Sequence, residues 1–226
     1  VMASLVGSRV ERKEDKRFLT GKGRYTSDIN LANQTHAIFV RSPHARAQIK
    51  KLDISKASKA SGIVSILTGN EIAEDKIGGL IAGWAIRSED GTEMKCPANP
   101  PLAKDNVNFV GDPIAIVIAD SLDEAKVAAE MVKVDYKVLK AVTGTADAMK
   151  GDAIHDGIDK NLCFDWLLGD RQKVKEAFDK ADKVISIDII NNRLVPNAME
   201  PRACVADYNS GSDEITLYTT SQNPHL

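Results

Sequence analysis

The 226-residue sequence contains few of the residues that build metal clusters and disulfide scaffolds. It has four histidines and three cysteines, Cys96, Cys163 and Cys204. The cysteines lie 67 and 41 residues apart, so no paired spacing indicates a zinc or iron–sulfur site. An odd, scattered set is typical of reduced thiols in a cytosolic protein, and we therefore expect a cytoplasmic location.

The sequence also lacks long apolar runs and an excess of either charge. Its longest apolar run, residues 114–119, has six residues, whereas a helix needs about 20 to cross a bilayer. Thirty basic and 32 acidic side chains give a net charge of −2 and a pI near 6.1. No global field favours nucleic acid or anionic lipid, so we expect no membrane span and no nucleic-acid partner.

Residues 114–138 carry the clearest pattern, which predicts a strand, a helix and a second strand. The run 114–119 is rich in β-branched residues and predicts a buried strand. Ser121, with Glu124 three positions on, predicts a helix start. One face of that helix is predicted to carry Leu122, Ala125, Ala129 and Val132. Residues 132–138 then alternate apolar and polar side chains, as a half-buried strand does.

Shorter elements are predicted on the N-terminal side of this module. Residues 36–41 and 63–67 have the composition of strands. Asp53 is placed to cap a short helix, which Gly62 would end because glycine readily adopts a positive φ.

The C-terminal part predicts a second and incomplete domain. Residues 143–159 lose periodicity and collect glycines, which is typical of a linker. Asp170 is then placed to cap an amphipathic helix, and three strands are predicted over 184–190, 203–208 and 215–220. An Asn-Ser-Gly-Ser turn predicts that the last two strands form a hairpin.

Several polar segments have a structural interpretation beside a functional one. Gly21 and Gly23 lack the context of a phosphate-binding loop, which favours a tight turn. The arginines and histidine of residues 41–46 could bind an anion, but they could equally tie a strand end to neighbouring loops. The mixed charges of residues 9–17 predict a solvated arm, or one that lies across another domain or subunit. Residues 199–202, Met-Glu-Pro-Arg, could hold a buried ion pair that fixes the entry to the next strand.

The strongest candidate site is the segment 219–225, Thr-Thr-Ser-Gln-Asn-Pro-His, where the last predicted strand ends. Neutral hydroxyl and amide groups both donate and accept hydrogen bonds, which suits contact with an oxo or hydroxo ligand better than charged groups would. An ordinary amide-rich turn is the alternative interpretation of the same pattern.

Separate motifs occur in the order found in one known family. They lie at residues 7–9, 14–25, 39–45, 110–117, 132–136, 192–203 and 220–225. Through them the chain resembles the molybdenum-binding subunit of the xanthine dehydrogenase, aldehyde oxidase and aerobic carbon monoxide dehydrogenase family. The resemblance implies an α+β fold, in which an α/β hammerhead domain precedes the first part of a molybdopterin-binding domain. The implied ranges are an arm at 1–18, the hammerhead domain at 19–142, a linker at 143–169 and the truncated second domain at 170–226.

The resemblance also implies a molybdenum hydroxylase. In this family a Mo-bound hydroxide attacks an aldehyde, an N-heterocycle or carbon monoxide, and electrons leave through iron–sulfur and flavin centres. By the match of motifs, Gln222 is the one catalytic and cofactor-binding residue, and its amide hydrogen-bonds an oxygen ligand of molybdenum. The implied cofactor is molybdenum–molybdopterin, in its cytosine dinucleotide form, with no side chain as a metal ligand. The implied partners are an iron–sulfur subunit and an FAD subunit in a hetero-oligomer, and a small-molecule substrate.

In the family, the catalytic glutamate and the substrate loop lie beyond the position of Leu226. We therefore expect the 226-residue chain alone to be inactive and to hold no cofactor. A stand-alone, non-catalytic module for subunit interaction is the main alternative, and a nucleotide-binding enzyme built on Gly21 and Gly23 is a third. The substrate stays open among carbon monoxide, an aldehyde, a purine and other N-heterocycles.

Overall fold

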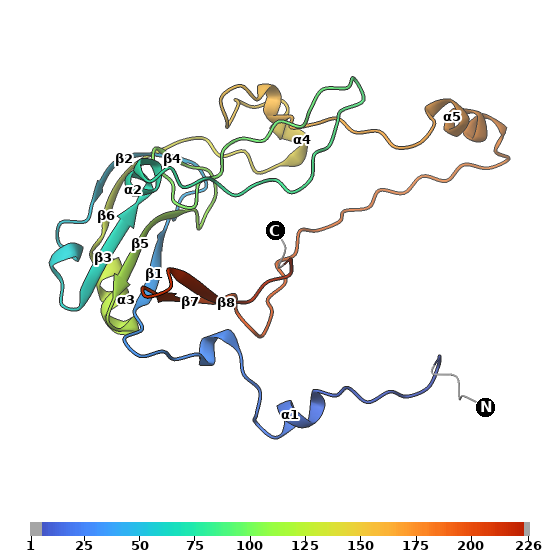
Figure 1. Cartoon of the computed structure of the whole chain (residues 1–226). Helices are drawn as coiled ribbons and strands as arrows, with labels where there is room; N and C mark the ends of the chain where they lie inside the picture. Colours follow the sequence, from blue (N-terminus) through green and yellow to red (C-terminus); the bar gives the residue numbers. More distant parts are fainter. Residues whose placement is uncertain (1–5, 224–226) are drawn as a thin grey trace. The chain divides into compact units, whose positions relative to one another are not determined.

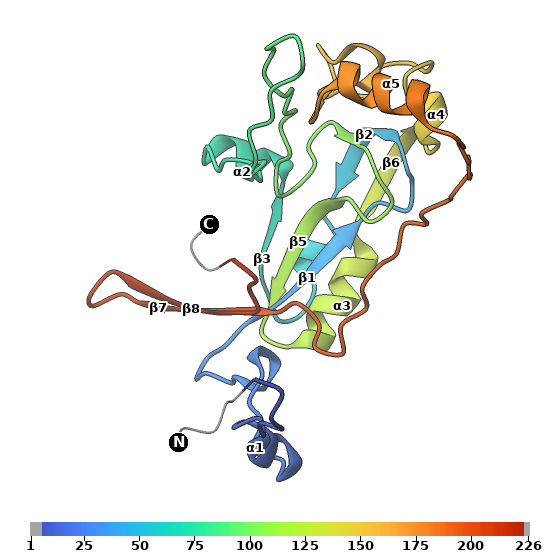
Figure 2. The ribbon, with the colours of Figure 1, turned by 90° about the vertical axis from the view of Figure 1, so that its right-hand side faces the viewer.

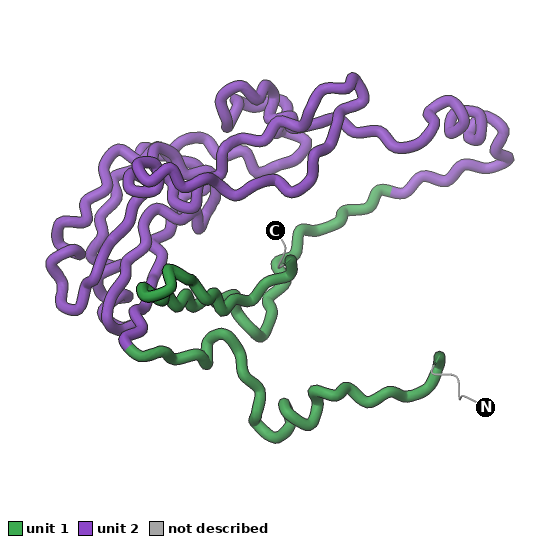
Figure 3. Tube along the Cα trace, in the orientation of Figure 1, with its two compact units in different colours: residues 1–32, 188–226 green, residues 33–187 purple. Residues whose placement is uncertain are grey.

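The computed structural model describes residues 6–223, which fall into two compact units (Figures 1 and 3). The central unit is the continuous stretch Asn33–Ile187. The terminal unit brings together the described parts of Val1–Ala32 and Asp188–Leu226, which come from opposite ends of the sequence.

Two antiparallel three-stranded sheets form the framework of the central unit (Figure 1). The first has the order β1-β5-β3, with β1 (His36–Arg41), β5 (Pro113–Ala119) and β3 (Ile63–Thr68). The second has the order β4-β2-β6, with β4 (Asn106–Val107), β2 (Ala47–Asp53) and β6 (Lys133–Val138). The strands predicted at 36–41, 63–67, 114–119 and 132–138 are therefore confirmed, as is the α+β class.

Helix α3 (Leu122–Met131) packs on the β1-β5-β3 sheet (Figure 2). It starts where predicted, since the Ser121 Oγ accepts a hydrogen bond from the backbone N–H of Glu124 at 3.3 Å. Ala125 and Ala128 are fully buried, because only small side chains let the helix approach the strands closely. The prediction that Leu122 lines this face is wrong, since Leu122 is 41% exposed.

Strand β5 contributes to two hydrophobic clusters, because successive side chains of a strand point to opposite faces. Ala115 and Val117 lie in the cluster beneath α3, together with Ile66 of β3. Ile114 lies in the other cluster, which contains Ala47 of β2 and Val107 of β4. The apolar run of β5 is thus explained by burial on both faces.

The connections differ in part from expectation. The Asp53 Oδ1 accepts a hydrogen bond from the Ser55 N–H at 2.9 Å, and the short 3-10 helix η2 (Ala57–Lys59) begins after it. Asp53 therefore closes a local turn and does not cap that helix. Helix α2 (Gly69–Glu74) was not predicted. Gly62 has a φ of 70° and ends the segment as predicted.

The predicted linker contains two short helices, and the helix after it begins where expected. The two short elements are α4 (Thr145–Ala148) and η3 (Asp159–Asn161). Helix α5 (Arg171–Lys180) is capped by Asp170, whose Oδ1 accepts a hydrogen bond from the Lys173 N–H at 3.0 Å. The apolar side chains of α5 are exposed within the described chain.

The terminal unit contains α1 (Asp15–Leu19), η1 (Thr26–Asp28) and a hairpin of β7 (Cys204–Asn209) and β8 (Glu214–Thr219). The hairpin and its turn are confirmed. The strand predicted at 184–190 is wrong, because this segment is extended but has no sheet partner in the described chain. Its apolar side chains are 54% to 86% exposed: Val184, Ile185, Ile187, Ile189 and Ile190.

Candidate functional site

The candidate site lies where β8 ends and the chain leaves the hairpin. The last cross-strand pair is Cys204 with Thr219, and the backbone N–H of Thr220 adds a hydrogen bond to the Ala203 carbonyl oxygen at 3.2 Å. Beyond Thr220 the chain no longer pairs with β7. Gln222 is therefore carried two residues past the last position that the hairpin fixes.

Gln222 is exposed and makes no hydrogen bond within residues 6–223. Its side chain therefore keeps two donors and one acceptor oxygen free for an external group. The described part of the segment, residues 219–223, contains hydroxyl and amide side chains and no carboxylate. Such a set does not repel an anionic group, so its chemistry fits a cofactor that carries phosphate and oxygen atoms. Pro224 and His225 lie outside the described residues.

Residues 6–32 of the terminal unit, called the arm from here on and longer than the predicted arm 1–18, reach this segment. The sequence patterns did not predict this contact. The Thr26 and Thr220 Oγ1 atoms lie 3.5 Å apart, although the residues are 194 positions apart in the chain. Thr26 belongs to η1, a turn in which the Asp28 Oδ2 accepts a hydrogen bond from the Tyr25 N–H at 2.9 Å. The spacing of Asp28, three positions after Tyr25, could have predicted this turn from the sequence. No local pattern indicated that Thr26 would lie near Thr220.

The arginines of residues 41–46 serve the fold. Arg41 donates from Nη1 to the Gly111 carbonyl oxygen at 2.9 Å. Arg46 donates to the carbonyl oxygens of Lys140 at 3.2 Å and Ala153 at 2.9 Å. The interpretation that this motif ties a strand end to neighbouring loops is confirmed. Both guanidinium groups already donate to backbone carbonyl oxygens, so fewer of their N–H donors are available to an anionic ligand.

The structure confirms the prediction for the glycine motif at residues 21–23 and contradicts the one for residues 199–202. Gly21 has a φ of 69°, and the Lys22 N–H donates to the Arg17 carbonyl oxygen at 2.9 Å, which confirms a tight turn. Glu200 and Arg202 are not buried, and no ion pair joins them in the described structure. The prediction of a buried ion pair at 199–202 is therefore wrong.

All three cysteines are free and exposed. Among residues 6–223, no three His, Cys, Asp or Glu side chains are close enough together to hold a metal ion. None of the helices in the same residues combines the length and the apolar character required to traverse a bilayer.

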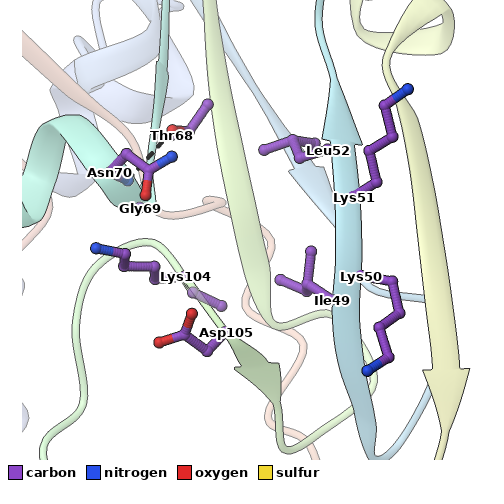
Figure 4. Close-up of a pocket in the computed structure, with 10 residues that line it drawn as sticks. Ile49, Lys50, Lys51, Leu52, Thr68, Gly69, Asn70, Lys104 and Asp105 are labelled. Atoms are coloured by element: carbon purple, nitrogen blue, oxygen red, sulfur yellow. Dashed lines mark hydrogen bonds between the residues drawn. The ribbon is translucent and has the colours of Figure 1, made fainter.

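A cavity of about 240 Å³ opens beside α2 in the central unit (Figure 4). Ile49 and Leu52 point toward it from β2, while the neighbouring lysines point to the other side of that strand. Its polar rim includes Thr68, whose Oγ1 accepts from the Asn70 N–H at 3.2 Å. This bond belongs to a capping box completed by Glu71, which the Thr-x-x-Glu spacing could have predicted. The polar groups on this side thus serve to start α2.

Gly69 allows the close contact between α2 and the loop at this cavity. A Cβ atom at this position would lie 2.7 Å from the carbonyl oxygen of Ala103, a backbone atom that cannot swing away. We expect Gly69→Ala to lower the free energy of unfolding by about 2 kcal/mol, as overpacking commonly does. Gly78→Ala is the matched control, because a Cβ atom there meets nothing within 4 Å. Urea denaturation of both variants tests this, and equal stabilities would contradict it.

Asp112 is a buried carboxylate at the start of β5. Its Oδ2 accepts a hydrogen bond from the Asn108 N–H at 2.9 Å, and its carbonyl oxygen accepts one from the Ser42 N–H at 2.9 Å. Burial raises the pKa of Asp112 above its ordinary value of 3.8, and the bond from Asn108 offsets part of this rise. The ionised carboxylate is thus less stable in the folded protein than in water.

A pH-dependent effect on stability follows. Because the folded-state pKa is raised, the penalty is fully present above that pKa and is relieved as the pH falls toward 3.8. Asp112→Asn keeps an oxygen that accepts from Asn108 and removes the charge. We expect its Tm to exceed that of the parent at pH 7, and the difference in Tm to shrink as the pH falls toward 3.8. Exposed Asp156→Asn should show no such trend. A lower Tm for Asp112→Asn at pH 7 would contradict this account.

Comparison with known families matches two successive parts of the chain. Residues 20–140, more than half of the chain, match the α/β hammerhead domain of aldehyde oxidase and xanthine dehydrogenase. Residues 154–226 match the molybdopterin cofactor-binding domain. Both the hairpin and Gln222 fall within the second match.

Individual proteins agree with these matches. The chain is 34% identical to the nicotine 6-hydroxylase large subunit of Paenarthrobacter nicotinovorans, over 100% of this chain and 27% of that protein. Quinoline 2-oxidoreductase from Pseudomonas putida 86 superposes with a TM-score of 0.79 at 30% identity, covering 96% of this chain and 27% of that one. The Cu,Mo-containing CO dehydrogenase superposes with a TM-score of 0.80 at 29% identity, covering 97% and 28%. The chain thus spans about a quarter of the length of the relatives it matches.

Proposed function

Because the chain belongs to the aldehyde oxidase and xanthine dehydrogenase family, we propose that it is the N-terminal part of the molybdenum-binding subunit of a molybdenum hydroxylase. The observation that carries this proposal is the free amide of Gln222, held at a strand end within the segment matched by the molybdopterin cofactor-binding domain. We propose the domain ranges 1–18, 19–142, 143–169 and 170–226. The match over 20–140 supports the second of these ranges, whereas the match over 154–226 begins inside the proposed linker.

Gln222 is the residue proposed to contact the cofactor. Its amide would donate a hydrogen bond to the molybdenum–molybdopterin group and would help to hold it without adding charge. The hydroxyl side chains of Thr219 and Ser221 precede this amide in the sequence and add no charge to the segment. When bound, the cofactor supplies a metal centre that acts as a Lewis acid and accepts two electrons. We propose the cytosine dinucleotide form of the cofactor.

The reaction class is oxidative hydroxylation of a small molecule, namely an aldehyde, an N-heterocycle or carbon monoxide. Water supplies the oxygen atom of the product. The substrate and water together release two electrons and two protons. We propose that the electrons pass to an iron–sulfur subunit and an FAD subunit, since the 226 residues show no cysteine spacing typical of such clusters. We therefore propose a cytoplasmic hetero-oligomer, in which the isolated 226 residues are inactive.

The extended segment 184–190 favours this proposal over a stand-alone interaction module. It exposes five large aliphatic side chains and, within the described chain, has no strand beside it. An exposed unpaired strand is an aggregation hazard that soluble modules normally avoid. A larger subunit would cover the segment with further strands of the same domain.

Affinity purification of the tagged protein from its source tests the proposal. We expect the chain's sequence to be recovered within a complex that contains molybdenum by elemental analysis, together with iron and flavin by absorption spectroscopy. Recovery of the chain without molybdenum, iron or flavin would instead support the stand-alone module.

A further inference from the structure

The terminal unit is held together by contact between the N-terminal arm and the β7–β8 hairpin. These parts are about as far apart in sequence as the chain allows, yet they form one compact unit, drawn in green in Figure 3. The contact runs between η1 and the β7 side of the hairpin, and it includes the 3.5 Å approach of Thr26 Oγ1 to Thr220 Oγ1. The arm therefore touches the strand end that carries Gln222.

The arm is stiff where it makes this contact. The Tyr25 N–H donates to the Asp28 Oδ2 at 2.9 Å, and the Asp28 N–H returns a bond to the Tyr25 carbonyl oxygen at 3.0 Å. The Ile29 N–H donates to the Thr26 carbonyl oxygen at 3.2 Å, and the Ile29 side chain is only 8% exposed. Thr26 thus sits in a closed turn, and the buried Ile29 follows three residues later, so the backbone that presents the Thr26 hydroxyl is fixed.

Thr220 is held from two sides. Its backbone N–H donates to the Ala203 carbonyl oxygen at 3.2 Å, and its hydroxyl faces that of Thr26. Gln222 lies two residues further on, and two residues span at most about 7 Å. The range open to the Gln222 amide is therefore set by how firmly Thr220 is held.

We propose that Thr26 is a positioning residue for Gln222. Its hydroxyl, presented by the capped turn Tyr25–Asp28, holds the Thr220 side chain and so limits where the Gln222 amide can lie. This inference rests on the proposed function of Gln222 as the cofactor contact. Thr26 itself contacts neither substrate nor cofactor in this account, and it acts through Thr220.

Hydrogen exchange on the 226-residue chain tests the contact without any cofactor. Thr26→Val keeps the shape and removes the hydroxyl, and we expect the Thr220 amide to exchange about three- to tenfold faster. Thr26→Ser should restore slow exchange. Thr20→Val is the matched control, because the Thr20 hydroxyl on the same arm bonds only to the local carbonyl oxygens of Lys16 and Arg17. Thr220→Val should match Thr26→Val, and the double variant should add nothing further. Unchanged exchange in Thr26→Val would overturn the proposal.

The assembled, molybdenum-loaded complex tests the consequence. We expect Thr26→Val to lower kcat about fivefold or more with KM unchanged, and Thr26→Ser to recover most of it. Two failures are distinguishable. If Gln222→Ala lowers kcat while Thr26→Val does not, the positioning role is wrong and the proposed function stands. If neither variant changes kcat, the proposed function of Gln222 is wrong as well.

Discussion

Replacing Gln222 by alanine in the molybdenum-loaded complex is expected to lower kcat about a hundredfold. Removal of one preorganised hydrogen-bond donor at a reacting centre commonly costs ~10² to 10³ in rate. Gln222 is the only side chain of the described segment that is proposed to contact the cofactor. KM should change little, because the lost bond is to the cofactor and not to the substrate.

Molybdenum content must be measured on the same preparations, so that loss of the cofactor is separated from loss of rate. Gln172→Ala is the matched control, because Gln172 is also an exposed amide but bonds only to Glu176 on α5. Wild-type kcat in Gln222→Ala, with normal molybdenum content, would contradict the assignment.

Ile114→Ala is expected to cause the largest loss of stability in the central unit. Ile114 is fully buried where Ala47, Ala103 and Val107 meet β5. Truncation removes buried aliphatic surface and leaves a cavity between backbone segments that cannot collapse, which commonly costs about 2–5 kcal/mol. The urea midpoint of the 226-residue chain should fall accordingly.

Val64→Ala provides the comparison for Ile114→Ala. It truncates an aliphatic side chain in the same sheet, but Val64 is 56% exposed, and we expect a loss below about 1 kcal/mol. Equal losses for the two variants would contradict the position of the core.

Local patterns predicted the central unit well, because its signals are local. The apolar run 114–119, the Ser121 helix start and the alternation over 132–138 each depend on residues within one element. All three elements are present. The face of α3 was mispredicted at Leu122, because close helix–sheet contact selects alanines, and a count of apolar residues cannot distinguish size.

The strand predicted at 184–190 shows a different limit. Its composition is that of a strand, but a strand exists only when another strand pairs with it. No strand of the described chain pairs with it, and its apolar side chains are exposed. The pattern of residues 184–190 predicted an extended backbone, but it could not predict whether another strand would pair with it.

The sequence nominates a residue for the candidate site but does not indicate what surrounds it. The neutral side chains of segment 219–225 and the order of the family motifs are properties of the sequence, and together they point to Gln222. The approach of Thr26 to Thr220 carries no local signal, since it joins residues 194 positions apart. Tertiary contacts of this kind are set by packing between distant segments.

A structure of the complete, molybdenum-loaded complex tests the central claim most directly. The account predicts that the Gln222 side-chain amide lies within hydrogen-bonding distance, about 3 Å, of the molybdenum–molybdopterin group. An amide in solvent, remote from molybdenum, would contradict it.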